Sequence, residues 1–477
     1  MRSAVFWRSG SQIVAQIITW GSTFLVIRML EPGDYGLVAM ATVLLAFLNL
    51  MNGYGFASSL IQRESIDRRA IRQVFGLLLL LNTGLALAQL ALAPLAAAYF
   101  REPMVAELLR VSAVSYLITP FIALPFALLS RELEYRKQAL ANLAGSLAGA
   151  ATALALAWLG YGVWALVFAP IALFGVKAIG LTIGARSLVW PSFSFKGAGA
   201  MIGFGGAMTA TQLFWFLQSQ SDVFIGGRVL DPHNLGLYTT ALFLTQILAA
   251  KFVPPLNDVA FATYSRMQGA GGDIAGGFAK SVRMIMLAAL PFYFGLAVTA
   301  EPLVLVILGE GWAGTIPLVA ILAQAMPFLT LQILFAPATN ARGRPWLAVR
   351  INMLGALIMP IAFLIGINWG TQGMAWAWLT GFPLLTLATI ALSLPVIGLS
   401  LRQLGAAILP ALAASGAMAA LVYGADVEIA RHLDPLPRLA LLVGCGITAY
   451  ACYLVAFARE ALAELWSFAS GRPLAAA

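Results

Sequence analysis

Arg28-Met29-Leu30-Glu31-Pro32, followed by Gly36-Leu37, recurs 200 residues later as Arg228-Val229-Leu230-Asp231-Pro232, followed by Gly236-Leu237. Each copy lies at the end of one long apolar segment and shortly before the next one begins. The match at one position of both halves indicates an internal duplication, with about six helices in each half. Because six is even, the two halves share one orientation, and a pseudo-two-fold axis along the membrane normal relates them.

The composition places the chain among membrane proteins. Its 477 residues are 61% hydrophobic and only 10% charged, and the mean hydropathy is +0.90. Soluble domains carry about 25% charged residues, so most of this chain's surface is expected to face hydrocarbon. A spanning helix needs about 20 apolar residues, and helices are favoured because they leave no backbone group unpaired in lipid.

Fourteen such segments predict an all-α polytopic membrane protein with about 14 transmembrane helices. The expected spans are 9–30, 35–56, 73–98, 106–128, 138–159, 162–184, 200–227, 235–256, 279–300, 314–337, 347–367, 371–396, 404–423 and 437–457. We expect four parts. They are an N-terminal six-helix lobe (1–186), a cytoplasmic interfacial linker (187–199), a C-terminal six-helix lobe (200–398), and two additional helices with a cytoplasmic tail (399–477).

The distribution of Lys and Arg predicts the orientation. With a cytoplasmic N-terminus, 22 of the 28 residues fall on the cytoplasmic side, as the positive-inside rule requires. The other six are Arg28, Arg101, Arg110, Arg228, Arg431 and Arg438. Both termini are thus expected in the cytoplasm, and the loop Gly424–Leu436 outside. The net charge of +9 is spread over the loops, so membrane orientation explains it better than nucleic-acid binding does.

The sequence lacks three common catalytic motifs. The phosphate-binding Gly-x-x-x-x-Gly-Lys-Ser/Thr loop, His-Glu-x-x-His and Gly-x-Ser-x-Gly are all missing. Cys445 and Cys452 share one apolar segment and are distant from His233 and His432, so they are expected to be core residues and not metal ligands. We therefore predict a transporter and not an enzyme, with no catalytic residue, metal or cofactor.

Polar residues in or near the spans predict a substrate cavity, because an ionisable group in hydrocarbon is costly. Arg28 shares the first span with Gln12 and Gln16, which form a polar stripe. The other candidate substrate-binding residues are Lys251, Arg228 and Arg350. Each cation has a structural alternative. For the two arginines of the repeated signature it is a pair with the acidic residue three positions later, and for the other two it is anchoring at the cytoplasmic headgroups.

Asp222 is the only acidic residue predicted well inside a span, and it follows Gln218 and Gln220. A carboxylate withdrawn from water can hold a proton or a cation. Asp222 is therefore the candidate ion-coupling residue, and the alternative is an ion pair that stabilises packing.

Several stretches together resemble the polysaccharide exporters of the multidrug/oligosaccharidyl-lipid/polysaccharide superfamily, and most closely the Wzx-type O-antigen and exopolysaccharide flippases. The matching stretches are Leu25–Gly36, Gly55–Arg63, Gly160–Leu166, Asp222 with Leu235–Tyr238, and Tyr264–Gln268. They cover roughly the first 270 residues, and the internal repeat extends the resemblance to about residue 396.

The resemblance implies alternating access of two lobes to an undecaprenyl-diphosphate-linked oligosaccharide at the bacterial inner membrane. Its implied partners are that substrate, membrane lipids, and polysaccharide polymerase and export machinery. Some relatives bind sodium through an acidic residue of the seventh helix and polar residues of the eleventh and twelfth, which here are Asp222, Asn352 and Thr380. A second carboxylate, expected one turn after the Asn, is Ala356 here. Coupling to Na+ or H+ is therefore left open.

Two other functions remain open at this point. A drug or small-solute antiporter of the same superfamily would lack the Arg-x-Leu-acid-Pro signature. A membrane-bound polysaccharide polymerase or ligase would need a large external loop, whereas the predicted external loops are short.

Overall fold

A computed structural model describes the backbone of residues 2–52, 67–194, 199–269 and 271–457, which form α-helices, three short 3-10 helices and their connections. The side chains of residues 1–13 and 199–212 lie outside this description. The chain forms two compact units, residues 1–236 and 237–477.

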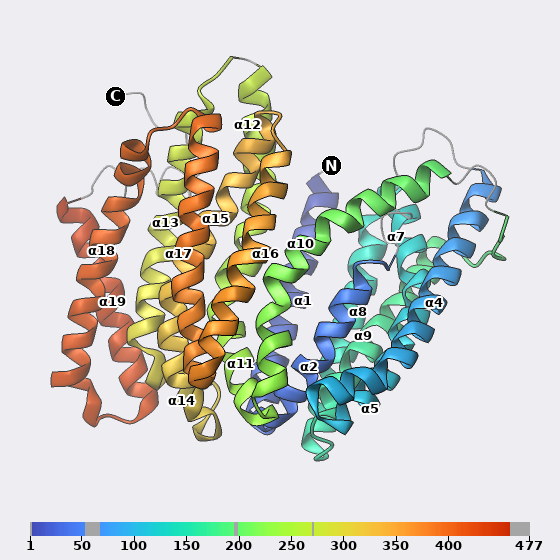
Figure 1. Ribbon diagram of the computed structural model, residues 1–477, viewed down its shortest axis with the longest axis horizontal. Coiled ribbons are helices and arrows are strands. Elements are labelled where there is room, and N and C mark those ends of the chain that lie inside the picture. The colour runs from blue at the N-terminus through green and yellow to red at the C-terminus, as the bar shows by residue number, and fades with distance from the viewer. Residues whose placement is uncertain (1, 53–66, 195–198, 270, 458–477) are drawn as a thin grey trace. The chain divides into compact units, whose positions relative to one another are not determined.

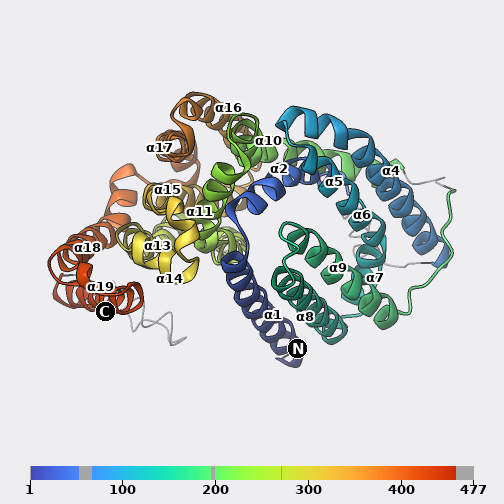
Figure 2. The same cartoon turned by 90° about the horizontal axis from the view of Figure 1, so that it is seen from below.

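The first unit is a bundle of long apolar helices. It contains α1 (Arg2–Met29), α2 (Pro32–Asn49), α4 (Arg68–Phe100), α5 (Pro103–Ser112), α6 (Val114–Ile118), α7 (Pro120–Arg131), α8 (Tyr135–Trp158), α9 (Trp164–Ala185) and α10 (Gly199–Val229). In Figures 1 and 2, α8 packs between α1 and α9, α9 also contacts α7, and α2 contacts α5 and α10.

Small residues allow α8 and α9 to pack closely. A Cβ placed on Gly145 of α8 would lie 2.8 Å from the carbonyl oxygen of Leu173 in α9, and one on Gly149 would lie 2.9 Å from the Leu173 Cβ. From the α9 side, a Cβ on Gly180 would lie 3.0 Å from the Cβ of Ala141. Helices in lipid gain stability from such close backbone approach, because no hydrophobic effect drives them together.

The second unit begins within α11 (Pro232–Lys251) and contains the remaining helices. They are α12 (Val253–Gly269), α13 (Ile274–Val298), α14 (Ala300–Ile307), η1 (Glu310–Thr315), α15 (Ile316–Ala341), α16 (Trp346–Gly366), η2 (Ile367–Trp369), α17 (Gly370–Ile397), α18 (Leu401–Glu428), η3 (Ala430–His432) and α19 (Pro435–Phe457). Its core lies where α13 meets α15 and α18 and includes Phe278 and Phe335.

The last two helices pack on this core and are fixed by one buried arginine. Arg438 of α19 donates to Asp426 of α18 at 2.7 and 2.8 Å and to Glu301 of α14 at 2.9 Å. Its side chain is only 9% exposed. The three-helix contact therefore joins the C-terminal hairpin to the same body as α13 and α14.

The structure confirms the predicted fold class, an all-α polytopic membrane protein. Among the described residues, eleven helical stretches are long and apolar enough to cross a membrane, and one of them, Trp346–Ile397, contains both α16 and α17. Each of the fourteen predicted spans coincides with helix over most of its described length. The number of crossings and the domain boundaries stay predictions.

The predicted fourth span, 106–128, lies within one candidate membrane span, Pro103–Arg131, which is divided into α5, α6 and α7 at Ala113 and Thr119. One local expectation was wrong. The predicted external loop Gly424–Leu436 is largely helical, since α18 continues to Glu428, η3 follows, and α19 starts at Pro435.

Candidate functional site

The two copies of the repeated signature meet each other. A Cβ on Gly36 would overlap the carbonyl oxygen of Pro232, and a Cβ on Gly236 would overlap the carbonyl oxygen of Pro32. The contact is reciprocal, so each glycine is needed because the other copy's first helical turn lies against it. All four residues belong to the first unit, where α2 contacts α10.

A second family-like stretch joins the same region. Gly162, in the turn before α9, has a φ of +54°, and a Cβ there would lie 3.2 Å from the Oδ1 atom of Asp34 in α2. The Asp34-Tyr35-Gly36 and Gly160-Tyr161-Gly162 stretches, singled out separately in the sequence, are thus neighbours in the structure.

Arg28 ends α1 with an exposed side chain. Within the part of the chain that the structure describes, the predicted alternative, a pair with Glu31, is not formed. The Glu31 backbone N–H instead donates to Asp34 at 3.3 Å. Gln16 is half-buried further along α1, and the side chain of Gln12 lies outside the described set.

Arg228 occupies the equivalent place at the end of α10 but is held by the protein. Its guanidinium donates to the carbonyl oxygen of Tyr99 and, at 3.3 Å, to that of Ala98, and it lies 5.4 Å from the centre of the Tyr99 ring. These carbonyls belong to the last turn of α4, which has no helical N–H partner for them. The expected pair with Asp231 is absent, because that carboxylate accepts hydrogen bonds from Asn234.

Asp222 is buried inside the first unit, with 1% of its surface exposed. Its Oδ1 atom accepts a hydrogen bond from the Val223 N–H at 2.7 Å, and it has further interactions within the bundle. Gln218, one turn before it, and Ser221, the residue directly before it, are 9% and 8% exposed, and the Gln218 Oε1 and Ser221 Oγ atoms have no hydrogen-bond partner in the described structure. All three residues belong to α10.

The remaining predicted residues belong to the second unit. Lys251 is the exposed last residue of α11, and Arg350 is an exposed residue of α16. Asn352 is half-buried on α16, and Thr380 is exposed on α17, where its hydroxyl donates to the Trp376 and Ala377 carbonyls of its own helix. Asn352 and Thr380 lie in a different unit from Asp222, so their predicted assembly into one ion site stays a prediction.

A family-wide sequence profile for polysaccharide biosynthesis proteins matches residues 25–317, well over half of the chain. The chain belongs to this family. It is 26% identical over 339 residues to the succinoglycan biosynthesis transport protein ExoT of Rhizobium meliloti, covering 70% of this chain and 69% of that one. It is 23% identical over 460 residues to the teichuronic acid biosynthesis protein TuaB of Bacillus subtilis, covering 95% of each.

Two solved structures share the fold of this polysaccharide biosynthesis protein. The inward-closed lipid II flippase MurJ superposes with a TM-score of 0.76 at 13% identity, covering 95% of this chain and 99% of that one. An inward-facing multidrug transporter of the superfamily superposes with a TM-score of 0.65 at 14% identity, covering 83% and 98%. The family match over residues 25–317 confirms the resemblance to polysaccharide exporters that the motifs indicated.

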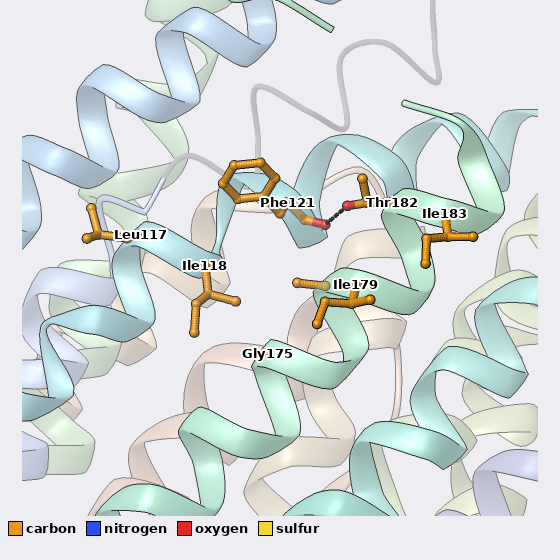
Figure 3. Close-up of a pocket in the computed structure, with 8 residues that line it drawn as sticks. Leu117, Ile118, Phe121, Gly175, Ile179, Thr182 and Ile183 are labelled. Atoms are coloured by element: carbon orange, nitrogen blue, oxygen red, sulfur yellow. Dashed lines mark hydrogen bonds between the residues drawn. The ribbon is translucent and has the colours of Figure 1, made fainter. Parts of the chain in front are cut away.

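An apolar groove of about 430 Å³ lies in the first unit between α6–α7 and α9 (Figure 3). It is lined by Leu117, Ile118, Phe121, Gly175, Ala178, Ile179, Thr182 and Ile183. The Thr182 hydroxyl donates to the Phe121 carbonyl at 3.2 Å, so the polar atom of the groove is already satisfied. None of the predicted site residues lines this groove, which suits hydrocarbon and not a charged group.

Several buried polar residues were not foreseen from the sequence. Asn82 and Gln89 of α4 are fully buried, and their side-chain NH₂ groups donate to the carbonyls of Leu78 and Leu109. Arg438 was counted only as an external charge. The two amides gave a weak signal in the sequence, because an amide in an apolar segment is usually interpreted as a hydrogen bond between helices. The pairing of Arg438 could not be predicted, because its partners are as much as 137 residues away.

No group of three or more His, Cys, Asp or Glu side chains that could hold a metal occurs among the described residues.

Proposed function

We propose that this polysaccharide biosynthesis protein moves an undecaprenyl-diphosphate-linked oligosaccharide across the bacterial inner membrane. The observation that carries the proposal is the family match over residues 25–317, which includes both copies of the signature. Its relatives are named for the biosynthesis or transport of succinoglycan and teichuronic acid, polymers of different composition. We expect one fold to transport several glycans when each of them is carried as a lipid-linked repeat unit.

The physical requirement is a polar path for a charged headgroup. A diphosphate with its sugars must cross about 30 Å of hydrocarbon while its prenyl tail stays in lipid. Exposed cations on the helices lower this barrier through charge-assisted hydrogen bonds to phosphate oxygens. Arg28 fits this role better than Arg228, since the Arg228 guanidinium already binds the end of α4.

The test is translocation by the purified full chain. Proteoliposomes carrying a fluorescent undecaprenyl-diphosphate-linked sugar should lose the signal of one leaflet to a membrane-impermeant quencher faster than protein-free vesicles do. If the protein instead exchanges small cationic dyes and leaves the lipid-linked sugar in place, it is an antiporter. Chain extension of the sugar, without movement, would indicate a polymerase.

We further propose that Asp222 couples transport to a proton or sodium gradient, with Asn352 and Thr380 as polar helpers. Support comes from the burial of Asp222 beside the unpartnered Gln218 and Ser221 oxygens. Asp222→Asn should keep substrate binding and lose the response of translocation to an imposed gradient. An unchanged response would assign Asp222 to packing.

The orientation and partners belong to the same proposal. Both termini are expected in the cytoplasm, and polysaccharide polymerase and export machinery are expected to receive the product. A single cysteine at Ala425 should react with an impermeant maleimide in intact spheroplasts, and one at Gly471 should react only after lysis. The reverse pattern would overturn the orientation.

A further inference from the structure

Lys177 is the single charged residue of α9, whose sequence is otherwise apolar or small. It lies eight residues before the helix ends at Ala185, about 12 Å along the helix axis. In a helix the Cα–Cβ bond tilts toward the N-terminus, so the Lys177 side chain starts away from the nearer end. Snorkelling to that end is therefore geometrically unfavourable, unlike the usual behaviour of lysines at helix ends.

The helix pair is built to leave room at this position. A Cβ on Gly145 of α8 would lie 3.1 Å from the Lys177 Cβ, so any side chain there would press on the lysine stem. Lys177 is half-buried, and it has neither an ion pair nor a hydrogen bond with the described part of the chain. By contrast, Lys137 at the start of α8 is 45% exposed and lies 3.6 Å from Glu134.

Lys177 lies at the depth of the predicted polar stripe on α1. Val26, Ala157 and Ala165 share one buried cluster, which fixes a common level for α1, α8 and α9. Lys177 lies 12 residues from that level along α9. Gln16 lies 10 residues from it along α1, which runs parallel to α8 (Figure 1). Arg28 lies at the level itself, so the two cations are separated by about 18 Å along the bundle axis.

We propose that the Lys177 ammonium binds the diphosphate of the lipid-linked substrate in the membrane interior, as an inner station before Arg28. The inference rests on the proposed function. An ammonium is a point charge with three donors, which suits a phosphate that passes through and does not have to be held in one geometry. Because the half-buried Lys177 has no carboxylate partner in the described part of the chain, its positive charge is available to an anionic ligand.

The experiment uses the full chain in nanodiscs of zwitterionic phosphatidylcholine, titrated with undecaprenyl diphosphate and followed by thermophoresis. Lys177→Met keeps an apolar stem of similar length and should weaken binding about tenfold or more, the worth of one charge-assisted hydrogen bond. Lys177→Arg should restore binding to within about threefold, since it keeps the charge. Lys137→Met is the matched control on the neighbouring helix and should bind like the wild type.

Further arms identify the source of the phosphate. Undecaprenol, which lacks the diphosphate, should bind all variants alike. A large excess of phosphatidylglycerol should not remove the difference between wild type and Lys177→Met; if it does, the site binds any anionic lipid and the assignment is overturned. Equal binding by wild type and Lys177→Met overturns this inference alone. A wild type that binds no undecaprenyl diphosphate overturns the proposed function with it.

Discussion

The two copies of the repeated signature have the same sequence pattern and different contacts. In the second copy, Arg228 closes the end of α4 and Asp231 accepts from Asn234. In the first, Arg28 is exposed and it is Asp34 that accepts, from the Glu31 backbone. The proline and glycine act alike in both, since each copy's glycine lies against the other's proline. Duplication has preserved the backbone crossing and left the charges free to take separate roles.

The largest effect is expected at the crossing itself. Gly36→Ala or Gly236→Ala places a methyl group on a backbone carbonyl that cannot move aside, and should cost about 3 kcal/mol of stability. The measurement is thermal unfolding and monodisperse yield in detergent. Gly33→Ala is the control, because a Cβ there meets nothing within 4 Å. Equal behaviour of Gly33→Ala and Gly36→Ala would show that the two copies do not touch.

Removing the arginine of the second copy should lower stability. Arg228→Ala leaves the last carbonyls of α4 without their charged donor and is expected to cost about 1.5–3 kcal/mol. Arg28→Ala should stay within about 0.5 kcal/mol of the wild type, as for an exposed side chain. Thermal unfolding of the two variants, measured side by side, tests this difference in stability. Equal losses of stability would show that the two arginines do not differ in their structural role.

Removing the arginine of the first copy should act on transport instead. Arg28→Ala is expected to reduce translocation of the lipid-linked sugar about tenfold at unchanged protein level, and Arg28→Lys to recover part of it because Lys lacks the bidentate fork. Lys251→Ala should act in the same direction. Initial rates in proteoliposomes are the readout. Normal rates for both alanine variants would show that Arg28 and Lys251 have a structural role only.

The smallest effect is a pH dependence that comes from Asp231 of the second copy. Burial alone would raise the pKa of Asp231, but the hydrogen bonds from Asn234 outweigh it and lower that pKa. A lowered folded pKa gives stability that is complete above the unfolded value of about 3.9 and disappears as the pH falls through the folded value. Asp231→Asn should therefore lose stability at neutral pH and match the wild type in strong acid. A constant difference at all pH values would contradict this.

The sequence predicted the helices well and their partners poorly. Apolar length alone located the fourteen helical segments, because a membrane allows few alternatives. Proline was ambiguous: Pro120 starts α7 after a break, whereas Pro327 and Pro337 lie inside the continuous α15. The difference depends on whether neighbouring groups satisfy the freed carbonyl, which spacing does not encode.

For the site, the sequence predicted the burial of Asp222 correctly, since an acidic residue amid apolar neighbours has a single physical interpretation. It gave Asp231 as the structural alternative for Arg228, whereas the partners of Arg228 are 129 and 130 residues away on α4. Lys177 was counted as a cytoplasmic charge, because a rule that counts charges by the nearest helix end ignores the direction of the side chain.

The Arg438 contact has a consequence for the order in which the protein is made. Glu301 leaves the ribosome 137 residues before its partner Arg438. At about 5–20 residues per second, the wait is roughly 7–27 seconds. The contact therefore forms only after α19 has been made, and a ribosome that stalls before α19 leaves a second unit in which Glu301 and Asp426 lack this partner.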